Sequence, residues 1–104
     1  MSTPLARLQS WYASQCNEDW EHSYGVSIGT LDNPGWLVEV DLTETELLEK
    51  PFNPVNRGDG ETDDDWIACK TESGKFIGAC GPFNLEETLS VFLDWATLHA
   101  TDAV

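Results

Sequence analysis

The chain has 104 residues and carries 19 Asp and Glu against 5 Lys and Arg, which gives a formal net charge of −14. This length fits a single domain over residues 1–104, and a hydrophobic fraction of 40% with five Trp excludes a disordered acidic tail. The acidic balance also argues against nucleic acid and anionic membranes as partners, because both are bound through Lys and Arg.

The chain is expected to be a reduced cytoplasmic protein. No apolar run approaches the ~18 residues that span a bilayer, and residues 1–7 lack the basic and apolar segments of a signal peptide. Cys16, Cys69 and Cys80 are odd in number and far apart, so no disulfide framework is expected. No Cys-x-x-Cys pair is present for zinc or redox chemistry.

A helix is predicted over residues 4–16. Thr3 supplies a hydroxyl that caps the first turn, and Pro4 has the fixed φ and the missing N–H that suit the first helical position. Apolar residues then recur at helical spacing and are expected to face a core: Leu5, Leu8, Trp11 or Tyr12, and Ala13 or Cys16.

From residue 23 the apolar period changes to two, which predicts a β-hairpin with strands near 24–29 and 36–42. The connection contains Pro34 and Gly35. Proline presets φ for the second position of a type II turn, and glycine takes the positive φ that the next position requires. In the first strand, Gly25 and Gly29 are expected to permit close packing.

The middle of the chain is less regular. Residues 43–50 contain the capping-box spacing of Thr43 and Glu46, which fits a short helix ended by Pro51, but an irregular edge strand is equally compatible. Residues 51–65 are rich in Pro, Gly, Asn and acids and are predicted to form a loop. A loop of this length in so small a domain is usually functional or mobile.

Two more strands are predicted over 65–71 and 75–79, with a tight connection at Ser73–Gly74 in which the glycine supplies positive φ. Asn84, with an acid three residues later, predicts a capped helix over 85–99. Two hairpins between two terminal helices predict an α+β fold. We expect an antiparallel sheet of about four strands, packed by an N-terminal and a C-terminal helix.

One segment suggests acid–base chemistry. His22 lies beside Asp19 and Glu21, and a histidine near carboxylates can transfer protons near neutral pH. A polar, solvated segment anchored in the core by Trp20 explains the same pattern, and no nucleophile or metal ligand is evident beside it.

A second segment suggests thiol chemistry. Cys80 ends a strand just before a helix, where a thiolate is favoured, but Glu86 and Glu87 oppose the thiolate. A buried free cysteine is the simpler interpretation, and a small thiol or sulfur-transfer enzyme is kept as an alternative. No cofactor or metal is expected, because the acids of 59–65 lack the spacing of a calcium loop.

The acidic residues themselves are the strongest functional signal. Self-repulsion at this net charge opposes the compact state, and a basic partner gives a reason to tolerate it. The expected contacts are therefore two acidic groups and two aromatic anchors. They are Glu18, Asp19 and Glu21; Asp59, Glu61, Asp63, Asp64 and Asp65; and Trp11 and Tyr12.

Over about residues 5–97 the sequence resembles the immunity protein 53 family. The most specific part is Trp20-Glu21-His22 followed closely by Thr30-Leu31-Asp32-Asn33-Pro34-Gly35-Trp36. Further likeness lies in Trp11-Tyr12, Tyr24-Gly25-Val26, Asp65-Trp66-Ile67, Phe76-Ile77-Gly78 and Phe92-Leu93-Asp94-Trp95. The motif residues expected to be structural are Trp20, His22, Gly25, Asp32, Asn33, Pro34, Gly35, Trp36 and Trp66.

The resemblance implies an α+β antidote of a bacterial polymorphic toxin system, encoded beside its toxin. It would act in the cytoplasm by binding a toxin domain, without catalysis, and the family does not fix the toxin's activity. Together with the charge, this predicts an antitoxin for a basic toxin, such as a nuclease. An acidic interaction module without a toxin partner is a further alternative.

Overall fold

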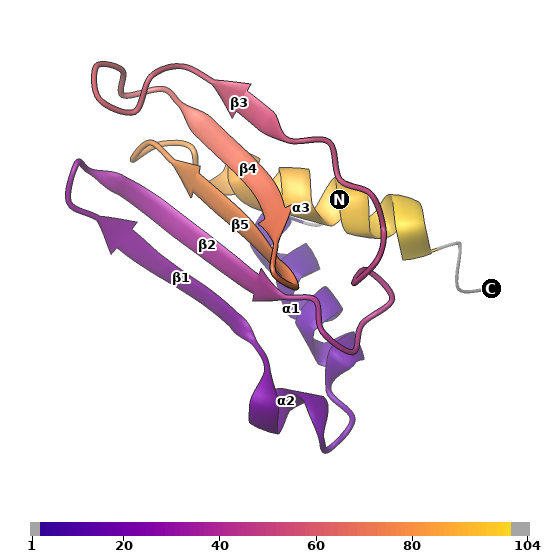
Figure 1. The fold of residues 1–104 in the computed structure, drawn as a ribbon. Helices are drawn as coiled ribbons and strands as arrows, with labels where there is room; N and C mark the ends of the chain where they lie inside the picture. The colour runs from indigo at the N-terminus through magenta and orange to yellow at the C-terminus, as the bar shows by residue number, and fades with distance from the viewer. Residues whose placement is uncertain (1–2, 101–104) are drawn as a thin grey trace.

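The computed structural model describes residues 3–100 and contains three helices and five strands (Figure 1). In chain order the elements are α1 (Pro4–Gln15), α2 (Trp20–Ser23), β1 (Val26–Leu31), β2 (Gly35–Asp41), β3 (Val55–Arg57), β4 (Ile67–Glu72), β5 (Lys75–Cys80) and α3 (Leu85–Ala100). The α1 helix begins as expected, because the Thr3 hydroxyl accepts a hydrogen bond from the N–H of Ala6 at 3.1 Å.

The five strands form one antiparallel sheet in the order β1-β2-β5-β4-β3, so β1 and β3 are its two edges. Figure 1 shows α1 and α3 together on one face of this sheet, and no helix of residues 3–100 covers the other face. The register pairs Val38 on β2 with Ile28 on β1 and with Gly78 on β5.

The core lies between the sheet and the two long helices. The sheet contributes alternate side chains of its central strands, which are fully or almost fully buried: Val38, Val40, Ile67, Cys69, Phe76 and Cys80. Phe92 of α3 is at their centre, and its ring lies 5.1 Å from that of Phe76 and 5.0 Å from that of Trp11 on α1. This burial of apolar surface is the main stabilising contribution to the fold.

The expectation of an α+β fold built from two hairpins and two terminal helices is confirmed, and the sheet has a fifth strand. Within the predicted loop 51–65, residues Val55–Arg57 form β3, which pairs Val55 with Cys69 of β4. The segment 43–50 is neither the helix nor the strand considered. It folds as successive turns that bury the Leu47 side chain completely.

The two tight connections differ in their use of glycine. At the β4–β5 turn both Ser73 and Gly74 have positive φ, as a type I′ turn requires. The type II turn expected at Gly35 is wrong, because Gly35 does not have positive φ and is the first residue of β2. Glycine is required there for a different reason: a Cβ at this position would collide with the carbonyl oxygen of Cys80.

Candidate functional site

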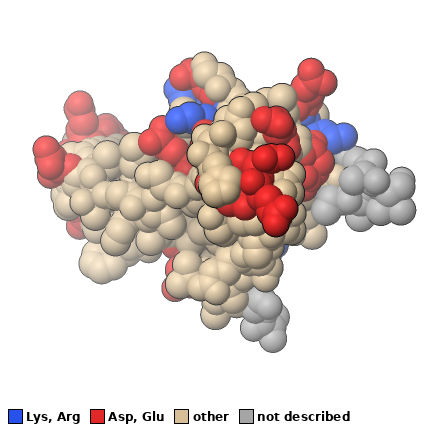
Figure 2. All heavy atoms as spheres, turned by 90° about the horizontal axis from the view of Figure 1, so that it is seen from below, with Lys and Arg blue, Asp and Glu red and all other residues tan. Residues whose placement is uncertain are grey.

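Negative charge is concentrated in one continuous part of the chain. Residues 8–49 contain nine Asp and Glu and no Lys or Arg. They form most of α1, all of α2, β1 and β2, and the turns of 43–50. Figure 2 views the molecule from the end at which α2 lies and shows carboxylates grouped at the centre, with blue cations mainly in the upper part.

Three of the five cations, Arg7, Arg57 and Lys70, pair with carboxylates outside residues 8–49, which leaves Lys50 and Lys75 against nine carboxylates. Lys75 on β5 lies 3.8 Å from Asp41 on the neighbouring β2. The Lys70 pair with Glu72 lies within β4, away from β1 and α2. We define the acidic side as α2 and β1 with the residues of 8–49 around them.

The loop before α2 is folded around the Glu21 carboxylate. Its two oxygens accept hydrogen bonds from the backbone N–H groups of Asn17 and Glu18, each at 2.9 Å. Backbone hydrogen bonds, first that of Glu21 itself and then those of Asn17 and Glu18, lower the pKa of the Glu21 carboxyl group. Glu21 is thus held charged and in position, and Glu18 and Asp19 are exposed beside it.

The two aromatic anchor candidates have different environments. The Trp11 ring packs edge-on against Trp20 at 6.0 Å and belongs to the core packing between α1 and α3. Tyr12 is 39% exposed, and its ring lies 6.0 Å from that of Trp20. Trp20 itself is buried, and its indole N–H donates to the Thr43 carbonyl oxygen at 3.0 Å.

The second predicted acidic group, in the β3–β4 loop, is largely engaged within the chain. The Asp63 carboxylate accepts from the Asp59 N–H at 2.7 Å, and the Asp59 carboxylate accepts from the Glu61 N–H at 2.8 Å. The Asn33 side chain donates to the Gly60 carbonyl oxygen at 3.3 Å, which joins this loop to the β1–β2 turn. Figure 1 shows the loop far from α2, so the structure does not bring the two acidic groups together.

Asp65 has a structural partner. The Arg57 guanidinium binds Asp65 at 2.6 Å and also forms an ion pair with Glu87 of α3. The Asn84 amide donates to Asp65 at 2.8 Å and to Glu87 at 3.2 Å. Hydrogen bonds from Arg57, and then from Asn84, lower the pKa of the Asp65 carboxyl group. Asp65 therefore has a cationic partner within the chain, which it shares with Glu87.

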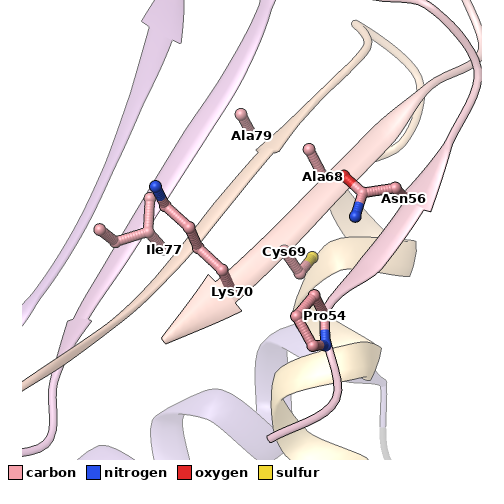
Figure 3. Close-up of a pocket in the computed structure, with 7 residues that line it drawn as sticks. All are labelled: Pro54, Asn56, Ala68, Cys69, Lys70, Ile77 and Ala79. Carbon is pink, nitrogen blue, oxygen red and sulfur yellow. The ribbon is translucent and has the colours of Figure 1, made fainter. Parts of the chain in front are cut away.

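The open face of the sheet carries a shallow hollow (Figure 3). Pro54 and Asn56 border it on one side, and the small side chains of Ala68 and Ala79 form its floor, with Ile77 and Lys70 beside them. Lys70 extends over this face and forms an ion pair with Glu72 at 3.2 Å. The hollow thus combines apolar surface with a cation.

The motif tryptophans are buried or half-buried. Trp20 and Trp66 are buried, and Trp36 is half-buried with its indole N–H donating to the Pro82 carbonyl oxygen at 3.1 Å. Close packing at Gly25 and Gly29 is not found, because a Cβ at either position would meet nothing within 4 Å. These two glycines mark an open surface along β1.

The buried cysteines do not support thiol chemistry. Cys80 is fully buried, and desolvation raises the pKa of its thiol. Burial also raises the pKa of Cys69, to about 12. Across residues 3–100, no three His, Cys, Asp or Glu side chains are grouped for binding a metal ion. Within the same range, no helix has the length and apolar character needed to cross a membrane.

Comparison with known proteins gives one match. The family model described as immunity protein 53 matches residues 5–97, which is nearly the whole chain. A search of curated proteins and a search of solved structures each found no match.

Proposed function

We propose, from the premise that this chain belongs to the immunity protein 53 family, that it neutralises a basic toxin domain by binding it through its carboxylates. The family implies an immunity protein whose partner is a toxin. In our proposal the toxin is a cationic enzyme such as a nuclease. The chain covers its active site in the cytoplasm and performs no catalysis of its own.

The observation that carries this proposal is the surplus negative charge of residues 8–49. Nine carboxylates without a Lys or Arg between them produce a negative potential on one side of the molecule. Enzymes that act on phosphodiesters hold their substrates with Lys and Arg, and those residues are what a carboxylate surface pairs with. Complementary potentials also raise the association rate, which suits an inhibitor that must act before the toxin does.

Exposed aromatic surface next to the charge supports the same function. Interface energy is concentrated in a few aromatic and charged residues that become buried on binding. Tyr12 lies beside Trp20, in contact with the segment that carries Glu18, Asp19 and Glu21. This arrangement supplies an aromatic anchor beside a segment that carries carboxylates.

Growth rescue tests the proposal. The C-terminal domain encoded by the reading frame beside this gene is expressed in bacteria with and without the 104-residue chain. We expect the domain alone to stop growth and the chain to restore it. A growth defect that persists when both are present, with the chain expressed and folded, contradicts the immunity function. It then favours an acidic interaction module with another partner.

A further inference from the structure

We propose that β1 is a docking strand: the toxin adds an extended segment to the free edge of β1 and so lengthens the sheet by one strand. This inference rests on the proposed function and identifies the surface that performs it. Main-chain hydrogen bonds along an added strand provide affinity, and alternate side chains provide specificity.

The first observation is that β1 is an exposed edge. Within residues 3–100 it pairs with β2 alone, and four consecutive residues, 27–30, are exposed although they lie in the middle of the strand. Ile28 faces the helix side of the sheet but is 37% exposed, because α1 and α3 pack over the more central strands. Both faces of β1 are therefore accessible beside its edge.

The register shows which backbone groups are free. The Asp41 N–H donates to the Gly25 carbonyl oxygen at 3.0 Å, so Gly25 and Asp41 form a hydrogen-bonded pair. Such pairs alternate along an antiparallel ladder. Residues 27, 29 and 31 thus bond to β2, and the N–H and C=O groups of Val26, Ile28 and Thr30 point away from it.

β1 lacks the features that normally protect an edge strand. It is six residues long, contains no Pro, Lys or other charged residue, and pairs with β2 without a bulge. The opposite edge, β3, is protected: it has three residues, follows Pro54, and ends at Arg57, which is paired with α3. The unprotected edge is therefore the one on the acidic side.

Charge identifies the occupant. The hollow beside β1 on the open face is lined by Gly25, Val26, Ser27, Glu39, Asp41 and Lys75. Lys75 lies 3.8 Å from Asp41, so the two carboxylates leave a net negative charge there, with Glu39 one strand in from the free edge. A second copy of this chain would bring two edges that lack cations together, at a net charge of −14 each. A segment with Lys or Arg is attracted to the same place. We therefore assign the edge to an extended segment of the cationic toxin.

The open-face hollow of Figure 3 is the competing surface. It is lined by small apolar residues on β4 and β5, but Lys70 extends over it. A cationic partner is favoured less there than at β1. Docking of the toxin at this hollow is thus an outcome that the experiment must distinguish.

Hydrogen exchange with the intact chain tests the docking strand directly. The probe is the toxin domain encoded by the neighbouring reading frame. In the free chain the amides of Val26, Ile28 and Thr30 are expected to exchange rapidly, and in the complex to slow by about 100-fold or more. A complex in which these amides exchange as in the free chain overturns the docking strand and leaves the immunity function standing. Protection of the same amides in the free chain, through dimerisation, overturns the assigned occupant.

A matched pair of proline variants gives a second readout. Ile28→Pro removes an outward N–H from β1 without removing a bond to β2. The Gly81 N–H donates to the Trp66 carbonyl oxygen, so by the same alternation the N–H of Asn56 on β3 points away from β4. Asn56→Pro therefore makes the same change at the opposite edge.

We expect Ile28→Pro to weaken toxin binding by about tenfold or more, and Asn56→Pro to change it by less than about twofold. If Asn56→Pro weakens toxin binding more than Ile28→Pro does, the docking strand is overturned. The toxin then binds at the β3 side, next to the hollow of Figure 3. If Ile28→Pro does not fold, the exchange measurement on the unmodified chain decides the question. Absence of any complex with the unmodified chain overturns the proposed function together with the docking strand.

Discussion

Arg57 on β3 and Glu87 on α3, thirty residues apart in the chain, form a bidentate ion pair: each of the two guanidinium Nη atoms donates to a different carboxylate oxygen. The same guanidinium binds Asp65 at the end of the β3–β4 loop. One side chain thereby ties an edge strand, an acidic loop and the first turn of a helix together. We expect the order of the β3–β4 loop to depend in part on this contact.

Removal of Arg57 is therefore expected to loosen the loop 58–65. In Arg57→Ala the carboxylates of Asp65 and Glu87 lose their shared cation and repel each other. We expect a lower urea midpoint of unfolding and faster amide exchange in the loop. Lys70→Ala is the matched control. The Lys70 side chain is about as exposed as that of Arg57, and its ion-pair partner is Glu72, two residues away on the same strand. Equal effects of the two changes would contradict a special role for Arg57.

The same contact makes stability depend on pH. The pKa values of Asp65 and Glu87 are lowered, mainly by Arg57, so the unfolded chain binds more protons than the folded chain at acidic pH. Their contribution is complete above the ordinary carboxyl pKa of about 4 and is lost as the pH falls through the lowered folded values. Protonation also relieves self-repulsion at −14, which acts in the opposite direction.

A difference measurement separates these two effects, because the relief of self-repulsion is nearly the same in the unmodified chain and in Arg57→Ala. We expect the stability gap between them to shrink as the pH is lowered below about 4. Urea unfolding at pH 7 and at pH 3 measures this gap. A gap that stays constant or widens on acidification would argue against the ion pair as the cause.

The two acidic groups are expected to contribute differently to toxin binding. The double change Glu18→Gln with Asp19→Asn removes two charges from the acidic side, and Glu61→Gln with Asp64→Asn removes two charges from the β3–β4 loop. We expect the first pair to slow association with the toxin domain more than the second, because it lies in the segment 8–49, which contains no Lys or Arg. Stopped-flow association rates compare them, and a larger effect of the loop pair would move the interface to that loop.

Alkylation of the native chain tests the thiol alternative. Cys16 is exposed and is expected to react at a rate similar to free cysteine. Cys69 and Cys80 are buried with raised pKa values, so both are expected to react far more slowly until the chain is unfolded. Intact mass measured over time counts the modified thiols. Rapid modification of Cys80 in the folded chain would restore the possibility of a thiol enzyme.

Elements with a strong local signal could be predicted from the sequence. The α1 helix with its Thr3 cap, the α3 helix and both hairpins carry their own periodicity and start or turn residues. The cap expected from Asn84 is not found, because the Asn84 side-chain oxygen accepts from the Trp66 N–H and its amide donates to Asp65 and Glu87. The short β3 strand could not be predicted, because three residues after Pro54 show no period and become a strand only by pairing with β4. The single turn of α2 could not be predicted for a similar reason. It is short, and it is stabilised by a hydrogen bond that the Trp20 N–H donates to the Asn17 side-chain oxygen.

The acidic surface could be predicted in part. Composition identified the surplus of carboxylates, but not which of them form hydrogen bonds or ion pairs within the folded chain. The Asp59 and Asp63 bonds are local, and the tendency of Asp to bond nearby backbone gave a signal for them. The pairing of Asp65 with Arg57 depends on a three-dimensional arrangement that includes Glu87, and no local pattern contains it. The free edge of β1 is likewise visible only from the strand order.

Association kinetics between the 104-residue chain and the neighbouring toxin domain measure docking through the acidic side. We expect a complex whose association rate constant falls by about tenfold or more between low salt and 0.5 M salt, because the Debye length shortens and the attraction is screened. A rate constant that is the same at both salt concentrations would contradict docking through the acidic side. The absence of any complex would contradict the immunity function itself.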